Sequence, residues 1–433
     1  MRTRLSLVVA AAVAALTFFP LLAQAQQKER AQFESDMEKA MPSAKPGGRP
    51  APASDGDADG KLGNTEMRKA NRTAAEILKR RMEQERPDDA KILRAAVGAD
   101  VVVVSGVYDR VQDVLRAVEV KHVVIPPSLL DRLDLLPTQT LMVNCPGQVS
   151  PAGIKKIHDF VARGGYLVTT DWAINVTAKA FPGTIEHNGQ RTPNDVVAVT
   201  THDANEPLLS HMKGLKDKPR WWLENASFPI RILDQKKVRV LMSSDEMKKK
   251  YGEGAVVVAF RFGDGKVLHM TSHFYLQQAK LLVASEKRGG SAFAKDVGLS
   301  DADVAAMKKK GVNPDDVRAG EVNSAYSMQQ VSANLLVEKQ RENDRLIKER
   351  YNGTITLDNV PLAGSPALAT TRPPPAAPPP PAKAGSKPSE PPAQPTTVKR
   401  DYRVQVLEQR GDKVKVRDLF GNEGWVPAQA VKK

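Results

Sequence analysis

The sequence predicts an α/β fold, with a mostly parallel sheet and flanking helices, followed by a small all-β module. Two observations carry this prediction. Continuous β-branched runs such as 101–104 are typical of strands covered on both faces, and they alternate with helical stretches. After a proline-rich stretch, the final residues alternate polar and apolar side chains between glycine-containing turns, which is typical of short antiparallel strands.

The N-terminus has the pattern of a secretory signal peptide. Arg2 and Arg4 precede an apolar run at 5–23, and Ala23-Gln24-Ala25 supplies a small-x-small cleavage site. We therefore expect residues 1–25 to direct export to the periplasm or beyond, with cleavage after Ala25. The alternative is a retained membrane anchor, because the apolar run approaches the ~20 residues that span a bilayer.

Composition limits the protein's stability and its partners. Cys145 is the only cysteine, so no intramolecular disulfide forms and the fold depends on its hydrophobic core. The formal net charge is +14. In an exported protein, this charge favours an anionic cell-wall polymer, an envelope protein or an anionic membrane surface over nucleic acid, for which no motif is visible.

Two segments precede the α/β domain. Residues 26–64 lack a repeating apolar face and are predicted to form a disordered tether. Residues 65–98 are predicted to contain an exposed helix, with Ala74, Ile77 and Leu78 as its few apolar anchors for docking on the next domain.

The α/β domain is predicted to span 99–346. Ser150 followed by Pro151 is typical of a helix start, and Gly164-Gly165 of a helix end. The sequence 263–265, Gly-Asp-Gly, indicates a hairpin and therefore antiparallel strands at one edge of the sheet. Strands are predicted at 101–104, 122–125, 140–143, 166–169, 196–200, 238–242, 255–261 and 266–271, with a polar insertion at 280–321 and a closing helix at 326–338.

Three motifs resemble the class I glutamine amidotransferase-like superfamily, whose core is a flavodoxin-like sheet. They are Met-Val-Asn-Cys-Pro-Gly at 142–147, Phe-Val-Ala-Arg-Gly-Gly-Tyr-Leu-Val at 160–168, and Gly-Lys-Val-Leu-His-Met-Thr-Ser-His-Phe at 265–274. The resemblance covers roughly 99–278 and extends at most to 346. It implies a flavodoxin-like, mostly parallel sheet with helices on both sides.

The chain departs from the pattern of catalytic members. The place of their nucleophilic cysteine is held by Asp171, between Thr170 and Trp172. His273 falls at the place of the catalytic histidine, but Tyr275 replaces the usual acidic partner two residues later. A thiol nucleophile needs a base and an orienting group. The resemblance therefore implies a relative without hydrolytic activity.

Residues 347–397 are predicted to form a linker, because 12 prolines in 366–395 favour an extended polyproline conformation. Beyond it, Val-Lys-Val-Arg-Asp at 414–418 and Gly-Trp-Val-Pro at 424–427 resemble bacterial SH3-like domains over residues 398–433. Such domains usually take about 55 to 60 residues. Either this domain is shortened or its first strand comes from elsewhere in the chain. The resemblance implies binding of peptidoglycan or peptides.

Three residues are candidates for catalysis, namely Cys145, Asp171 and His273. Cys145 ends a strand at the carboxyl edge of the sheet, but a small buried residue is the favoured interpretation. Candidate binding residues are Trp172, Tyr275, Trp425, Tyr402 and Phe420. No histidine or cysteine spacing matches a metal motif, so we expect no metal and no cofactor.

These observations favour an exported cell-envelope binding or scaffolding protein. Its amidotransferase-like domain would be non-catalytic, and its SH3-like tail would bind cell-wall or peptide ligands. The alternative is an exported hydrolase that acts on sugars or amide-containing wall fragments.

Overall fold

The computed structural model describes Lys28, Ser35 and the ranges 31–33, 60–96, 98–202, 206–210, 212, 218–273, 284–363 and 397–433. The chain divides into two compact units. The large unit spans residues 33–344, and the small unit combines residues up to Gln32 with 345–433. The predicted signal peptide and most of the predicted tether lie outside the described residues. Among the described helices, none combines the length and apolar character that a bilayer span requires.

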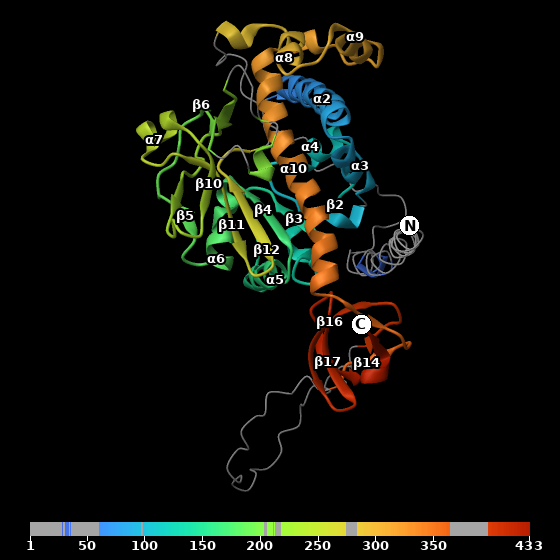
Figure 1. Cartoon of the computed structure of the whole chain (residues 1–433). Helices are drawn as coiled ribbons and strands as arrows, with labels where there is room; N and C mark the ends of the chain where they lie inside the picture. The colour runs from blue at the N-terminus through green and yellow to red at the C-terminus, as the bar shows by residue number, and fades with distance from the viewer. Residues whose placement is uncertain are drawn as a thin grey trace, which may run out of the picture. The chain divides into compact units, whose positions relative to one another are not determined.

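An eight-stranded mixed sheet forms the centre of the large unit (Figure 1). Five parallel strands stand in the order β2-β1-β3-β4-β12, and β11, β10 and β7 extend the sheet in antiparallel fashion. This confirms the predicted α/β class. The strands are β1 (Val101–Val104), β2 (Val123–Ile125), β3 (Thr140–Val143), β4 (Tyr166–Thr170), β7 (Thr200–Thr201), β10 (Arg239–Ser243), β11 (Ala255–Phe262) and β12 (Gly265–Met270).

Local sequence signals explain several boundaries in the sheet. The β-branched β1 is buried along its whole length. Helix α5 (Pro151–Ala162) begins where Ser150 Oγ accepts a hydrogen bond from the Gly153 amide at 3.0 Å. Gly165 follows the helix because a Cβ there would lie 2.3 Å from the Phe160 ring. These signals fix the passage from α5 into β4.

Two short strand pairs lie outside the large sheet. Strand β5 (Ile185–His187) pairs with β9 (Ile230–Ile232), and β6 (Asp195–Ala198) pairs with β8 (Arg220–Leu223). The β6–β8 pair buries Trp221, whose Nε1 donates a hydrogen bond to Ser327 Oγ at 2.9 Å. This contact ties the pair to the long helix α10 (Ala319–Glu349).

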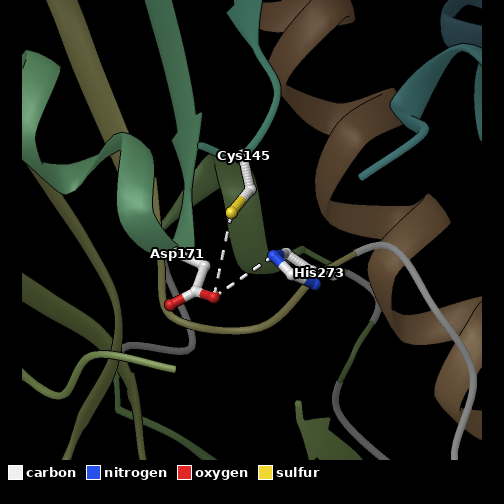
Figure 2. Close-up of side chains that lie close together, drawn as sticks. All are labelled: Cys145, Asp171 and His273. Carbon is white, nitrogen blue, oxygen red and sulfur yellow. Dashed lines mark hydrogen bonds and ion pairs between the residues drawn. The ribbon is translucent and has the colours of Figure 1, made fainter. Parts of the chain in front are cut away.

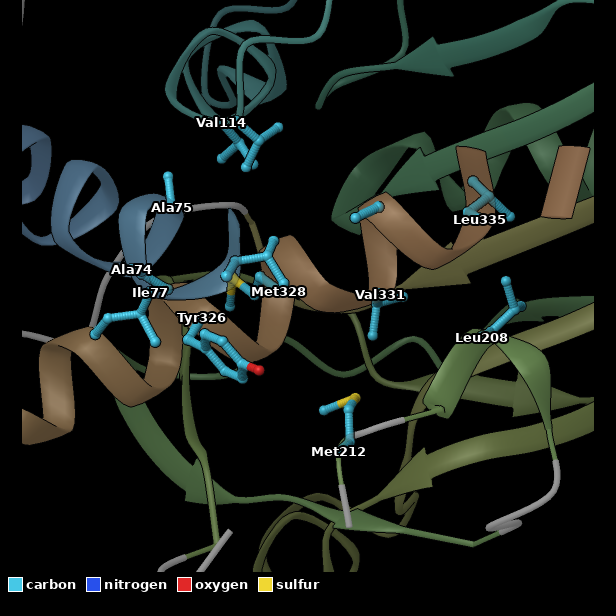
Figure 3. Close-up of a cluster of buried hydrophobic side chains, with 14 of the residues drawn as sticks. Ala74, Ala75, Ile77, Val114, Leu208, Met212, Tyr326, Met328, Val331 and Leu335 are labelled. Carbon is cyan, nitrogen blue, oxygen red and sulfur yellow. The ribbon is translucent and has the colours of Figure 1, made fainter. Parts of the chain in front are cut away.

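Helix α10 organises the hydrophobic core of the large unit. Figure 3 shows Tyr326, Met328, Val331 and Leu335 of α10 among side chains from other elements. Almost every residue of α10 from 319 to 337 is buried, including polar ones such as Gln329. A helix buried on all sides needs covering elements besides the sheet.

Two predictions about these covering elements were wrong. The helix expected to be exposed within 65–98 is instead α2 (Gly60–Glu85), followed by α3 (Pro87–Ala95), and α2 is buried beyond its predicted anchors, at Ala70, Thr73 and Ala75 as well. The expected insertion at 280–321 contains α8 (Gly290–Asp296) and α9 (Asp301–Lys309), whose Phe293 and Met307 join the same core. Their apolar residues were too sparse to reveal that α10 needed them.

The remaining helices of the large unit are short. They are α4 (Val111–Ala117), α6 (Ile174–Ala180) and α7 (Asp245–Tyr251). Helix α6 matters for the site because it follows β4 through the turn at Asp171–Ala173.

The small unit contains a five-stranded antiparallel sheet in the order β18-β17-β16-β13-β19, together with a β14–β15 pair. Ala363 and Trp425 exchange two backbone hydrogen bonds, at 3.0 and 2.8 Å. The strands are β13 (Gly353–Ile355), β14 (Val360–Pro361), β15 (Thr397–Val398), β16 (Arg403–Arg410), β17 (Lys413–Asp418), β18 (Glu423–Pro427) and β19 (Val431–Lys432).

The sheet of the small unit corrects the predicted linker at 347–397. Strand β13 lies before the proline-rich run, yet it pairs with β16 and β19 after it. Pro361 likewise pairs with Thr397 across the run. The run therefore connects two paired strands of one module. The strand that the sequence did not reveal is β13, which is short and precedes a segment with disordered composition.

Candidate functional site

Cys145, Asp171 and His273 meet at the carboxyl edge of the large sheet (Figure 2). Cys145 follows β3, Asp171 directly follows β4, and His273 follows β12. These three strands are parallel neighbours, so their carboxyl ends lie side by side, where open α/β sheets bind ligands. The exposed fractions are 1%, 2% and 3%, so all three side chains are buried.

The polar atoms of this cluster lie close together. Asp171 Oδ2 is 4.0 Å from Cys145 Sγ and 3.2 Å from His273 Nε2. The other ring nitrogen, His273 Nδ1, lies 2.5 Å from Oε2 of Glu224, which directly follows β8. One imidazole therefore lies between two carboxylates, with a thiol beside one of them.

The loop after β8 fixes the Asp171 carboxylate. Oδ1 accepts a hydrogen bond from the Phe228 amide at 2.9 Å, and Oδ2 accepts one from Ser227 Oγ at 3.2 Å. The backbone of Asp171 has φ = 42°, in the left-handed region that aspartate tolerates better than most residues. This conformation lets the chain turn from β4 toward α6 while the carboxylate faces His273.

Burial and neighbouring charges set the protonation of the cluster. Burial alone would lower the pKa of His273, but hydrogen bonds with Asp171, Cys145 and Glu224 raise it well above its usual value. Burial raises the pKa of the Cys145 thiol, and this outweighs the opposite effect of its hydrogen bond with His273. The neighbouring carboxylates thus favour the protonated form of the imidazole, and burial favours the neutral form of the thiol.

A row of aromatic rings lies beside this cluster. Its members are Tyr108, Trp172, Phe228 and His187, with ring centroids separated in that order by 6.2, 5.4 and 4.5 Å. The Arg191 guanidinium lies 5.3 Å from the centroid of Trp172 and 5.7 Å from that of Phe228. Tyr108 is 50% exposed and its neighbour Val107 is 69% exposed. We call these four rings the aromatic row.

The predicted binding residues lie in both units of the structure. Trp172 is half-buried in the aromatic row, and its Nε1 donates a hydrogen bond to the Ala226 carbonyl at 2.7 Å. In the small unit, Tyr402 is a buried core residue with its ring 6.3 Å from that of Phe420. Trp425 is half-buried, with the Arg410 guanidinium 5.3 Å from its ring centroid. Tyr275 lies outside the described residues.

Sequence reasoning missed Glu224 and Tyr108. The interpretation of the sequence left the role of acidic partner to His273 vacant, whereas the structure supplies two carboxylates, from Glu224 and Asp171. The sequence offered one weak signal, because Glu224 immediately follows the strand that contains Trp221 and Trp222. Tyr108 follows β1 just as Cys145 follows β3, so its place at the same edge could have been predicted.

Comparison with known proteins yields structural similarities only. No family model and no curated protein matches the sequence. A putative GMP synthase component from Thermoplasma acidophilum is 12% identical, with 59% of this chain and 98% of that chain covered and a TM-score of 0.33. A glutamine amidotransferase from Thermotoga maritima is 9% identical, with 59% and 99% covered and a TM-score of 0.29.

A third similar structure is an exo-β-1,4-mannosidase from Opitutaceae bacterium strain TAV5. It is 15% identical, with 44% of this chain covered and a TM-score of 0.29. The matched part of this chain spans about a third of that enzyme, since 34% of its length is covered.

Proposed function

We propose that the protein is an exported cell-envelope binding protein whose large unit holds a wall glycan or peptide without hydrolysing it. The observation that carries this proposal is the aromatic row beside the Asp171 and Glu224 carboxylates. Binding sites typically combine apolar and aromatic walls with a few polar groups. The half-exposed Tyr108 offers aromatic surface to a ligand, and the exposed Arg191 offers a cation to an acidic group on that ligand.

The geometry of the cluster supports a non-hydrolytic role. A nucleophilic thiol needs a neighbouring base that accepts its proton. Here both nitrogens of His273 face carboxylates, and the Cys145 thiol lies within hydrogen-bonding range of Asp171 Oδ2. The raised pKa values of both groups agree with this arrangement. Each imidazole nitrogen therefore already has a carboxylate neighbour, which favours ligand binding over activation of the thiol.

The small unit supports envelope binding through its resemblance to SH3-like domains and its half-buried Trp425. The net charge of +14 favours retention on anionic wall polymers.

Tyr108→Ala and Arg191→Ala are each expected to weaken binding of a soluble disaccharide-peptide wall fragment about tenfold. An aromatic or arginine anchor typically contributes about 1–2 kcal/mol at a binding site, and about 1.4 kcal/mol corresponds to a tenfold change. Isothermal titration calorimetry of the full mature chain measures the change. Both side chains are exposed, so neither substitution should disturb the core.

Leu233→Ala is the matched control, because Leu233 is also exposed on the large unit but lies outside the aromatic row. It should bind as tightly as the wild type. The proposal fails if the wild type does not bind the fragment, or if all three variants bind it equally well.

One observation favours a second candidate function, a thiol hydrolase acting on amide-containing wall fragments. Cys145, His273 and Glu224 have the residue types of a nucleophile, a base and an orienting acid. If the protein only binds its ligand, the wild type and Cys145→Ser should be retained equally on purified cell walls, and neither should hydrolyse them. Release of wall fragments by the wild type but not by a folded Cys145→Ser protein would establish the hydrolase instead.

A further inference from the structure

We propose that Cys145 Sγ, Asp171 Oδ2 and His273 Nε2 together bind a zinc ion. This inference goes beyond the proposed ligand binding, which depends on the aromatic row. It also departs from the sequence-based expectation of no metal. Metal motifs in sequences depend on short spacings between ligands, whereas these three ligands come from the ends of three separate strands.

The donor set suits zinc. A thiolate, an imidazole and a carboxylate are all common zinc ligands, while calcium and magnesium require sites built from oxygen atoms. Three protein ligands leave the fourth tetrahedral position for water or for an anionic group of a bound ligand. One thiolate and one carboxylate also balance the two positive charges of the ion.

The distances are close to those of a tetrahedral site. Zinc bonds of about 2.0 Å to oxygen and nitrogen and about 2.3 Å to sulfur place oxygen and nitrogen about 3.3 Å apart, and oxygen and sulfur about 3.5 Å apart. The structure has 3.2 Å between Asp171 Oδ2 and His273 Nε2, and 4.0 Å between Asp171 Oδ2 and Cys145 Sγ. All three donor atoms lie within 4.8 Å of one another. A shift of the thiol by about 0.5 Å toward Asp171 brings the oxygen–sulfur distance to the tetrahedral value.

The surrounding hydrogen bonds orient two of the ligands. Histidines that bind zinc usually donate their second ring N–H to a carboxylate, and Glu224 Oε2 lies 2.5 Å from His273 Nδ1. Asp171 is fixed by the Phe228 amide and Ser227 Oγ. Glu224 is thus a positioning residue that favours the tautomer with its proton on Nδ1 and its lone pair on Nε2.

Burial and charge complete the case. The three ligands are at most 3% exposed, and the Asp171 and Glu224 carboxylates lie 3.2 and 2.5 Å from the two nitrogens of the same imidazole. A bound divalent ion would balance the charges of the Asp171 carboxylate and the Cys145 thiolate, with the thiol proton released on binding.

The test uses the full mature chain, purified without chelator or affinity metal. Elemental analysis by mass spectrometry should find about one zinc per chain, and cobalt(II) added after chelation should give a thiolate-to-cobalt charge-transfer band. Cys145→Ser should lose this band, and His273→Gln should weaken zinc binding at least 100-fold. Glu224→Gln should weaken it about 10- to 100-fold, as for other residues that orient metal ligands.

His202→Gln is the control, because His202 is exposed and contacts Ser243 away from the cluster. It should bind zinc like the wild type. Glu224 is only partly buried, so its variant keeps the test valid if His273→Gln fails to fold; circular dichroism checks folding in each case.

The proposal is overturned if folded wild-type protein neither contains zinc nor binds it at 10 µM. It is also overturned if a folded Glu224→Gln protein binds zinc as tightly as the wild type. Neither outcome affects the Tyr108 and Arg191 measurement, so the zinc site and the ligand-binding function can fail separately.

Discussion

A fragment that begins at Thr397 is expected to remain unfolded, whereas a fragment spanning 345–433 is expected to fold cooperatively. The shorter fragment lacks β13, which pairs with both β16 and β19 in the small sheet. Without β13, β19 loses its partner and β16 becomes an open edge. The shorter fragment is also less than about 40 residues long, and chains this short usually need disulfides, metals or oligomerisation to fold.

Core packing gives the size of this effect. Ile355, Val360 and Leu362 are buried among residues that follow the proline-rich run, including Val398 and Val404. Burying one such side chain contributes about 1.5–3 kcal/mol, so three contribute about 5–9 kcal/mol. A core of this size rarely supplies more than about 3–5 kcal/mol of net stability. Without these three residues, the lost burial free energy therefore exceeds the net stability of the small unit.

Amide dispersion in proton–nitrogen NMR spectra distinguishes the two outcomes. As a control, a short glycine-serine turn replaces 364–396 within the longer fragment. It should fold like its parent, because Pro361 and Thr397 are already paired across the replaced segment. A dispersed spectrum from the fragment starting at Thr397 would show that β13 is dispensable.

The sequence predicted the central strands because their signals are local. The valines of β1 and the Gly164-Gly165 passage into β4 each specify an element within a few residues. Burial of α2, α8 and α9 was missed because it depends on how these helices pack around α10, whose residues 319–337 are buried. Burial of this kind depends on tertiary packing, which the periodicity of a local sequence does not reveal.

The same contrast applies to the site. Cys145 was a candidate because it ends a strand at the carboxyl edge of the sheet, and Asp171 and His273 were candidates because they fall at the places of catalytic residues in the family that the sequence resembles. Glu224 was missed because it follows β8 of the β6–β8 pair, which lies outside the large sheet and whose position no periodicity predicts. The zinc proposal depends on this omitted residue, since Glu224 orients His273.

The buried Lys339 of α10 is expected to make the stability of the large unit depend on pH. Its Nζ donates hydrogen bonds to the carbonyls of Pro137 and Gly164, each at 2.7 Å. It also lies 4.8 Å from the ring centroid of Tyr166. Burial lowers the pKa of Lys339 to about 7, although nearby carboxylates, led by that of Glu342, oppose this.

The direction of the effect follows from proton binding. In the unfolded chain Lys339 keeps its proton until the pH nears its ordinary pKa of 10.5, whereas in the folded unit it loses the proton near pH 7. The unfolded state therefore binds more protons between these values, and the free energy of unfolding rises with pH by up to about 1.4 kcal/mol per unit. Between pH 7 and 9 the contribution amounts to about 2 kcal/mol.

Other groups titrate in or near this pH range. The measured quantity is therefore the difference in the free energy of unfolding between the wild type and Lys339→Met. Because the pKa of His273 is raised in the folded unit, its contribution to the free energy of unfolding is lost as the pH rises above 6.5, the usual pKa of histidine. The raised pKa of Tyr326 gives one that is lost as the pH rises above 10. Both groups remain in Lys339→Met, so their contributions cancel when the variant is subtracted from the wild type.

Urea denaturation of the full mature chain at pH 7, 8 and 9, followed by tryptophan fluorescence, measures this difference. The stability of the wild type relative to Lys339→Met should rise by about 2 kcal/mol from pH 7 to 9. Lys155→Met is the control, because the Lys155 side chain is 78% exposed, and it should keep the wild-type pH profile. Parallel pH profiles for the wild type and Lys339→Met would mean that Lys339 stays charged in the folded unit, held by its two carbonyl acceptors and the surrounding carboxylates.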